Sequence, residues 1–196
     1  MVKTNLPARA ALTVVAALLT VSCVTEVHET PSARFSDTSI ISVYDPDTAI
    51  PAGATFAWLP EAVHYYADER IKDAPLKSQI EQEIIAELKA KKMNFVDSAN
   101  GARYTIAYTA ALASSLDDGA IIQRYGLLPG NTRVPVNDAN VEKGSLIIYV
   151  FNNKTDEIIW RSAAQAGVRF DIPAEERKQR IADVVTQLFQ SFPVAE

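Results

Sequence analysis

The sequence predicts an α+β fold, a largely antiparallel sheet of about five to six strands with two amphipathic helices packed on one face. Three observations predict it. β-Rich and helical segments follow one another as strand, strand, helix, several strands and helix. Two segments repeat apolar residues at steps of three and four. The part of the chain that carries them has about 155 residues, enough for one domain with a single core.

The first half of this region predicts two strands and a helix. "TSIISVYD" (38–45) and "ATFAWLP" (54–60) are short β-rich segments bounded by the turn residues "PDTAIPAG" and by Pro60. Ahead of the helical segment "PLKSQIEQEIIAELKAKKM" (75–93), Asp73 is a plausible N-cap, and Pro75 lies in the predicted first turn. The apolar stripe of this helix consists of Leu76, Ile80, Ile84, Ile85 and Leu88.

The second half predicts further strands and a terminal helix. "NFVDS" (94–98) gives a brief strand, and "ARYTIAYTAALA" (102–113) a long one that places on one face Tyr104, Ile106, Tyr108, Ala110 and Leu112. "SLIIYVFNNKTDEIIWRSAAQAGVRF" (145–170) predicts a hairpin that turns at "NNKTD", and its apolar "LIIYVF" favours a central strand covered on both sides for part of its length. Pro173 then lies near the first turn of a helix whose apolar residues are Ile181, Val184, Val185, Leu188, Phe189 and Phe192.

The segment 116–143 predicts a long loop. Its glycines and prolines are too dense for a regular helix or strand, namely Gly119, Gly126, Pro129, Gly130 and Pro135. Ile121, Ile122, Leu127 and Leu128 need cover, so the loop either folds back over the sheet or offers them to a partner. We expect the core to be built from the elements outside it. The interaction candidates are Arg124, Tyr125 and Arg133, which suit an acidic or aromatic partner group; a disordered insertion is the alternative.

The N-terminus predicts a signal peptide. Lys3 and Arg9 precede the stretch "AALTVVAALLTVSCVTEV" (10–27), in which Ala10 to Val21 are almost entirely apolar and Cys23 is the single cysteine of the chain. About a dozen apolar residues are too few for a transmembrane helix, which needs roughly 20, so a secretory signal over residues 1–22 is the better interpretation.

Leu18, Leu19, Thr20, Val21 and Ser22, directly before Cys23, resemble a bacterial lipobox, although Thr20 departs from its usual Leu. The resemblance implies that Cys23 is the acylated first residue of the mature protein and anchors it in the membrane. A free cysteine that is discarded with the signal peptide is the alternative. Val24 stands where an Asp would resemble an inner-membrane retention signal, which favours the outer membrane, facing the periplasm.

The expected organisation is a signal peptide (1–22), a lipidated Cys with a flexible tether (23–38) and a single periplasmic α+β domain (39–196). Without Lys3 and Arg9, 17 basic residues remain against 24 acidic ones, a net charge of −7. An acidic surface repels nucleic acid, so we expect no nucleic-acid partner. The expected partners are the membrane, through the lipid on Cys23, and another envelope protein.

Four motifs carry a family resemblance that covers roughly Ser39 to Pro193. They are "YDPDTAIPAGATFAWLP", a helix ahead of "ARYTIAY", "KGSLIIYVFNNKTDEIIWRSAA" and a terminal helix that ends in "LFQSFP". In this order they resemble the uncharacterised bacterial lipoproteins grouped as domain of unknown function 4136. The resemblance implies a fold and a location and assigns no activity, and the long loop 116–143 departs from the family pattern.

Candidate catalytic and metal-binding groups are sparse. His64 and Asp68 are spaced as metal ligands can be on a helix, but the chain has only two histidines, and a solvated turn is the better interpretation. Calcium prefers oxygen ligands, and the candidates for such a site are Asp117, Asp118, Asn137, Asp138 and Asn140. Their spacing does not match an EF-hand loop. There is no G-x-S-x-G motif. We expect no catalytic residue, no metal and no cofactor.

The aromatic residues suggest either a carbohydrate-stacking platform or core packing, and core packing is favoured for Trp58, Tyr104, Tyr108, Tyr149 and Trp160. The leading hypothesis is a non-enzymatic binding or interaction module of the cell envelope. A small apolar-ligand carrier is the first alternative and would need a deep apolar cavity between sheet and helices. A cell-wall hydrolase is the second, and would need a pocket of convergent acids.

Overall fold

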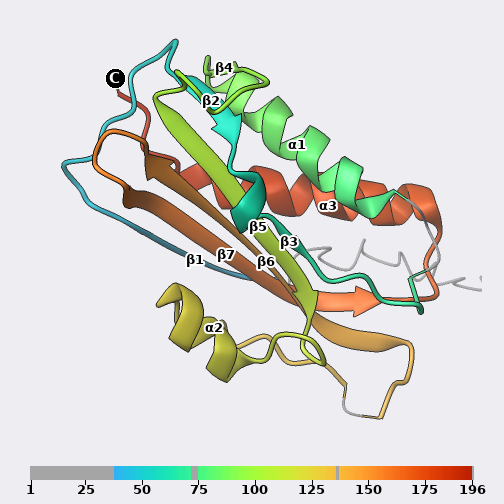
Figure 1. The fold of residues 1–196 in the computed structure, drawn as a ribbon. Helices are drawn as coiled ribbons and strands as arrows, with labels where there is room; N and C mark the ends of the chain where they lie inside the picture. The colour runs from blue at the N-terminus through green and yellow to red at the C-terminus, as the bar shows by residue number, and fades with distance from the viewer. Residues whose placement is uncertain (1–37, 72–74, 136, 196) are drawn as a thin grey trace, which may run out of the picture. The chain divides into compact units, whose positions relative to one another are not determined.

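The computed structural model describes residues 38–71, 75–135 and 137–195. In these ranges a mixed seven-stranded sheet carries two helices on one face and a third helix on the other (Figure 1). The strands are β1 (Ser39–Tyr44), β2 (Thr55–Trp58), β3 (His64–Tyr65), β4 (Asn94–Phe95), β5 (Tyr104–Leu112), β6 (Val141–Asn152) and β7 (Glu157–Arg169). The helices are α1 (Leu76–Ala90), α2 (Asp118–Tyr125) and α3 (Ala174–Leu188), with 3-10 turns at Pro60–Ala62 and Phe189–Ser191.

The sheet has an antiparallel half and a parallel half. Its order is β1-β7-β6-β5-β2-β4, with β3 also beside β5. β1, β7, β6 and β5 pair antiparallel, which confirms the predicted hairpin 145–170, whereas β2 pairs parallel with both β4 and β5, and β3 pairs parallel with β5. The prediction of a largely antiparallel sheet of five to six strands is therefore only approximate. The parallel pairs arise because the crossover through α1 returns the chain in the same direction.

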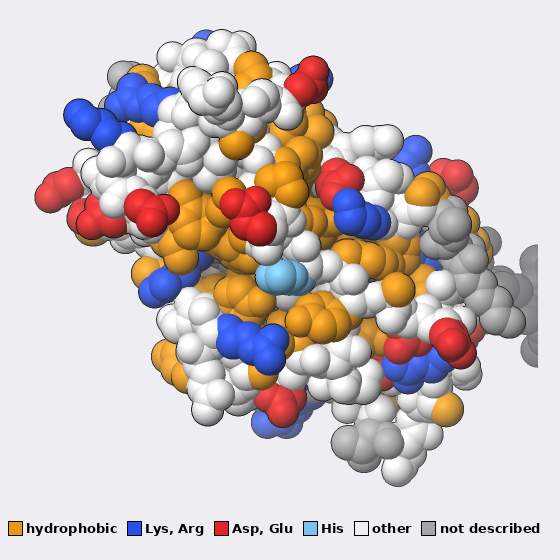
Figure 2. Space-filling view, viewed as in Figure 1, with side chains coloured by type: hydrophobic (Ala, Val, Ile, Leu, Met, Phe, Trp, Pro, Cys, Tyr) orange, Lys and Arg blue, Asp and Glu red, His pale blue; other side chains and the backbone are white. Residues whose placement is uncertain are grey.

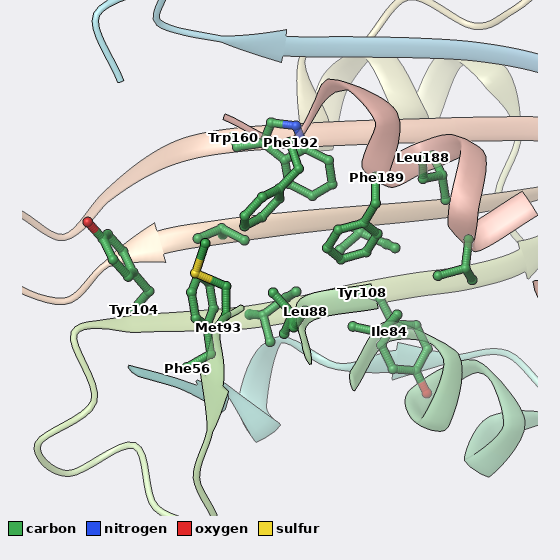
Figure 3. Close-up of a cluster of buried hydrophobic side chains, with 14 of the residues drawn as sticks. Phe56, Ile84, Leu88, Met93, Tyr104, Tyr108, Trp160, Leu188, Phe189 and Phe192 are labelled. Carbon is green, nitrogen blue, oxygen red and sulfur yellow. The ribbon is translucent and has the colours of Figure 1, made fainter. Parts of the chain in front are cut away.

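The main core lies between the sheet and the pair α1 and α3, which pack against each other on one face (Figure 1). Trp160, Phe189 and Phe192 form an aromatic cluster with ring centroids 5.2–5.4 Å apart (Figure 3). Both predicted helices are confirmed. Pro75 and Pro173 stand at the N-cap positions, immediately before the helices, and Asp73 lies outside the described residues.

The segment 116–143 differs from its prediction, because it contains a regular helix. The Asp117 carboxylate accepts a hydrogen bond from the Ala120 backbone N–H at 2.8 Å and caps the start of α2. Gly126 ends the helix in the left-handed conformation (φ 60°), and its N–H donates to the Ile122 carbonyl. The prediction of no regular element was wrong because Gly126 terminates a helix rather than preventing one.

A second core lies on the opposite face of the sheet, under α2. Ile121 and Leu127 are 2% and 1% exposed and pack, with Leu116, on residues of β5, β6 and β7 that include Ala107, Ile147, Tyr149 and Ala163. The expectation that the core is built entirely outside 116–143 is therefore wrong. The cover on both faces explains why all nine residues of β5 are buried, and it confirms the double cover expected for "LIIYVF".

Candidate functional site

The predicted interaction residues lie on the segment that runs from α2 to Arg133, where they have different surroundings. Tyr125 is held against the sheet: its hydroxyl bonds the Thr109 hydroxyl at 2.8 Å, and its ring lies 5.8 Å from that of Tyr149. Arg124 and Arg133 are exposed. Tyr125 thus anchors the segment, while the two arginines remain accessible to a partner.

Two apolar residues of the same segment are exposed to solvent, and the sequence left open whether they are covered by the sheet or by a partner. Ile122 is 46% exposed and Leu128 is 68% exposed, although their neighbours Ile121 and Leu127 are buried. We call Ile122, Arg124 and Leu128 the α2 surface. Figure 2 shows hydrophobic side chains gathered in a band around the histidine, on the face that carries β3 and β5, with charged side chains on both sides of it. The signal for this surface was a pair of apolar doublets, Ile121–Ile122 on α2 and Leu127–Leu128 after it, each of which buries only its first member.

The acidic residues of this segment have structural partners. Asp118 forms an ion pair with Lys143 at 2.5 Å and accepts a hydrogen bond from the Gln165 amide. Burial opposes ionisation of Asp118, but the bonds from Lys143 and Gln165 outweigh it, and its pKa is lowered. Asp138 accepts from the backbone N–H of Asn140. Within the described residues, no group of three or more His, Cys, Asp or Glu side chains is placed to hold a metal ion.

The aromatic candidates are packing residues. Trp160, Tyr104 and Tyr108 belong to the main core, and Trp58 packs edge-on against Tyr108 at 5.8 Å between ring centroids. Tyr149 lies in the second core. These five aromatics therefore do not form an exposed stacking platform.

An apolar groove lies between the sheet and the N-terminal halves of α1 and α3, at the end of the sheet away from Trp160. It encloses about 180 Å³. The groove exists because the residues that face the helices become small at this end, namely Ala110 on β5, Gly144 on β6 and Ala164 and Ala166 on β7. A Cβ at Gly144 would stand 2.4 Å from a methyl carbon of Val168, so a side chain at this position would displace Val168.

The rim of the groove is basic. Arg177 is only 7% exposed, and its guanidinium donates to the carbonyls of Arg169 and Ile172, which fixes the connection from β7 to α3. Arg180, one turn later, donates to the Gly167 carbonyl at 3.2 Å. Sequence reasoning missed both residues. Arg177 was visible as a cation on the same helical stripe as Ile181 and Leu188.

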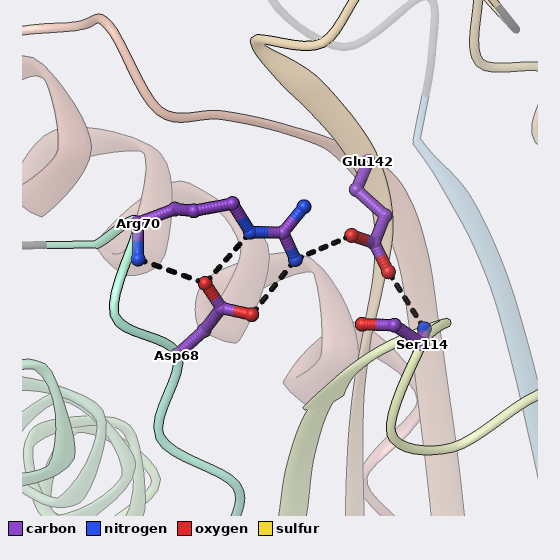
Figure 4. Close-up of polar contacts among 4 residues, drawn as sticks. All are labelled: Asp68, Arg70, Ser114 and Glu142. Atoms are coloured by element: carbon purple, nitrogen blue, oxygen red, sulfur yellow. Dashed lines mark hydrogen bonds and ion pairs between the residues drawn. The ribbon is translucent and has the colours of Figure 1, made fainter.

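An ion-pair network joins the segment after β3 to the start of β6 (Figure 4). Arg70 donates to Asp68 at 2.7 and 2.8 Å and to Glu142 at 2.6 Å, and Glu142 also accepts from the Ser114 backbone N–H. Arg70 further lies 4.4 Å from the ring centroid of Phe170. Asp68 is thus bonded to Arg70, while His64 is an exposed residue of β3.

The network shifts the protonation of its acids. Hydrogen bonds from Arg70 lower the pKa of Asp68 to about 2. Burial opposes ionisation of Glu142, but hydrogen bonds from Ser114 and Arg70 outweigh it, and the pKa of Glu142 is lowered. Both carboxylates are therefore ionised at neutral pH and serve as ion-pair partners.

Comparison with known families decides the classification. The family model described as domain of unknown function DUF4136 matches residues 41–194. The chain belongs to the DUF4136 family. No curated protein matches this DUF4136 chain. In the described residues of this DUF4136 protein, no helix has both the length and the apolar character needed to cross a membrane.

Solved structures are similar to this DUF4136 chain at low identity. A DUF4136 family protein from Bacteroides thetaiotaomicron is 15% identical with a TM-score of 0.48, and the alignment covers 80% of this chain and 96% of that one. PelC from Paraburkholderia phytofirmans, a dodecamer, is 9% identical with a TM-score of 0.49, covering 81% and 99%. Lipoprotein GNA1162 from Neisseria meningitidis is 10% identical with a TM-score of 0.37, covering 71% and 99%. These similarities assign no function to this chain.

Proposed function

We propose that this DUF4136 protein is a lipid-anchored envelope protein whose domain is a non-enzymatic interaction module, with the α2 surface as its contact site. One observation carries the proposal. Leu128 is 68% exposed directly after Leu127, which is 1% exposed. The segment is therefore fixed to the sheet and at the same time displays apolar side chains to solvent, which supports its assignment as a protein contact site.

The chemistry of the α2 surface defines the kind of partner. Arg124 lies between Ile122 and Leu128 in the sequence, and Arg133 follows on the same segment. Neither arginine forms an ion pair with another described residue. The fitting partner is an envelope protein with an apolar contact surface that carries an acidic group.

The location of the protein is proposed from the N-terminus. Cys23 and the predicted signal peptide lie outside the described residues, as does the predicted tether up to residue 37. The lipobox-like residues before Cys23 support acylation, and Val24 supports the outer membrane, facing the periplasm. The lipid then holds the domain at the membrane, where an envelope partner is available.

The groove residues favour binding over hydrolysis. The groove is lined mainly by apolar side chains, and the acid among its described residues is Asp183 alone. Hydrolysis of a glycosidic bond ordinarily needs two carboxylic groups that face each other. The described residues therefore favour the interaction module over the alternative of a cell-wall hydrolase.

The α2 surface can be tested with a matched pair of variants. Ile122 and Ile158 are each 46% exposed, but Ile158 lies on β7, outside the α2 surface. We expect Ile122→Asp to retain the unfolding midpoint of the parent and to lose the partner that copurifies with the lipidated protein from detergent-solubilised envelopes. Ile158→Asp should retain that partner. If Ile122→Asp still retrieves every partner of the parent protein, the contact site lies outside the α2 surface.

A further inference from the structure

The groove differs from the α2 surface in place and in chemistry. It lies on the α1 and α3 face of the sheet, whereas α2 covers the other face. We propose that the groove binds a single medium-length fatty acyl chain with an anionic head group, and that Arg180 pairs with the head group. This binding site is independent of the proposed protein contact.

The walls of the groove define its apolar part. α1 contributes Leu76 and Ile80, and α3 contributes Ile181 and Val184. The opposite wall is the sheet, with Leu112 and Leu146 beside the small residues of β5, β6 and β7. Ile181 and Val184, which line the groove from α3, are only half-buried. An apolar ligand would cover them and gain the free energy of that burial.

The size of the groove limits the ligand. An apolar cavity of about 150 Å³ takes up benzene. At about 180 Å³, and open to solvent on one side, the groove accommodates a somewhat larger apolar group. A single chain of roughly six to eight carbons fits this space, whereas a ligand with two chains would leave one of them in water.

The charges at the rim select the head group. The lining residues include Arg169, Arg177 and Arg180, and among the described residues of the lining Asp183 is the one acid. Arg169 forms ion pairs with Asp171 and Asp138, and the Asp183 carboxylate accepts a hydrogen bond from Gln179. Arg180 donates to a neutral carbonyl and forms no ion pair with another described residue. Its charge is therefore available for a carboxylate.

The experiment is a calorimetric titration of octanoate into the chain that begins at residue 23, with Cys23→Ser so that no acyl group is present. Both cores are built from residues after residue 38, so this chain retains them. We expect octanoate to bind and octylammonium, which has the same chain and the opposite charge, to bind at least about tenfold more weakly. Absence of octanoate binding, or equal binding of both probes, would overturn the proposal.

Matched variants locate the site. Arg180→Gln should weaken octanoate binding about tenfold, whereas Lys178→Gln, an exposed position on the same helix outside the groove, should leave it unchanged. Ala166→Leu should fill the groove and abolish binding, whereas Ala86→Leu on the exposed face of α1 should not. Equal affinities within either pair would place octanoate elsewhere and contradict the assignment.

A third measurement keeps the test valid if Ala166→Leu does not fold. A photoreactive octanoate should label the parent protein on peptides of α3 and β7 that line the groove, and labelling confined to other peptides would overturn the site.

Thr38, the first described residue, also lines the groove. Octanoate binding that appears only after removal of residues 23–37 would identify that segment as the natural occupant and refute the proposed acyl ligand.

Discussion

Replacement of Leu127 by alanine tests whether the α2 segment belongs to the cooperative fold. The substitution removes the three carbons beyond Cβ from a side chain that is 1% exposed. At about 0.8 kcal/mol for each buried CH₂ group, the lost transfer free energy is about 2.4 kcal/mol. The cavity left in the second core adds to it, so the free energy of unfolding should fall by about 2–5 kcal/mol.

The assay is equilibrium unfolding in urea, followed by far-UV circular dichroism. Leu128→Ala is the matched control, because the adjacent side chain is 68% exposed and its truncation should change the free energy of unfolding by less than about 0.5 kcal/mol. A Leu127→Ala protein as stable as the Leu128→Ala protein would show that the second core does not contribute to folding and would refute the anchored segment.

Three further predictions concern the main core, the ion-pair network and the anchor. Leu188→Ala removes a fully buried side chain and should cost about 2–5 kcal/mol of unfolding free energy; an unchanged thermal midpoint would show that this face is exposed. The lowered pKa values of Asp68 and Glu142 stabilise the fold above pH ~4, and this stabilisation should be lost between pH ~4 and pH ~2. In Arg70→Gln the unfolding midpoint should depend less on pH over this range, and a dependence as steep as that of the parent would contradict the assignment. Cys23→Ser should leave an unprocessed or soluble periplasmic form, a result that palmitate labelling equal to the parent would contradict.

The elements that could be predicted are those whose pattern is local. The stripe that ends in Leu188 and Phe189 repeats at helical spacing, and it forms α3 and the 3-10 turn that follows. The turn residues "NNKTD" lie between two β-rich arms, and they form the loop between β6 and β7. In both cases the determining residues are close together in the sequence, so the pattern alone is sufficient.

The features that were missed depend on distant residues or on an ambiguous signal. The groove requires Ala110, Gly144 and Ala166 to converge from three strands, and no sequence window contains all of them. The sequence does contain the two residues that cap α2, Asp117 at its N-terminus and Gly126 at its C-terminus. Glycine is compatible with both a loop and a helix end, and a helix of only eight residues offers few repeats to distinguish them.

The central proposal is that the α2 surface contacts an envelope protein, and site-specific photo-crosslinking in intact cells tests it most directly. A photoreactive amino acid at position 128 lies on this surface, and one at Gln82 lies exposed on α1, on the opposite face of the sheet. We predict that irradiation produces a discrete crosslinked product from position 128 and none from position 82. A product from position 82 with none from position 128, or no product from either, would contradict the proposal.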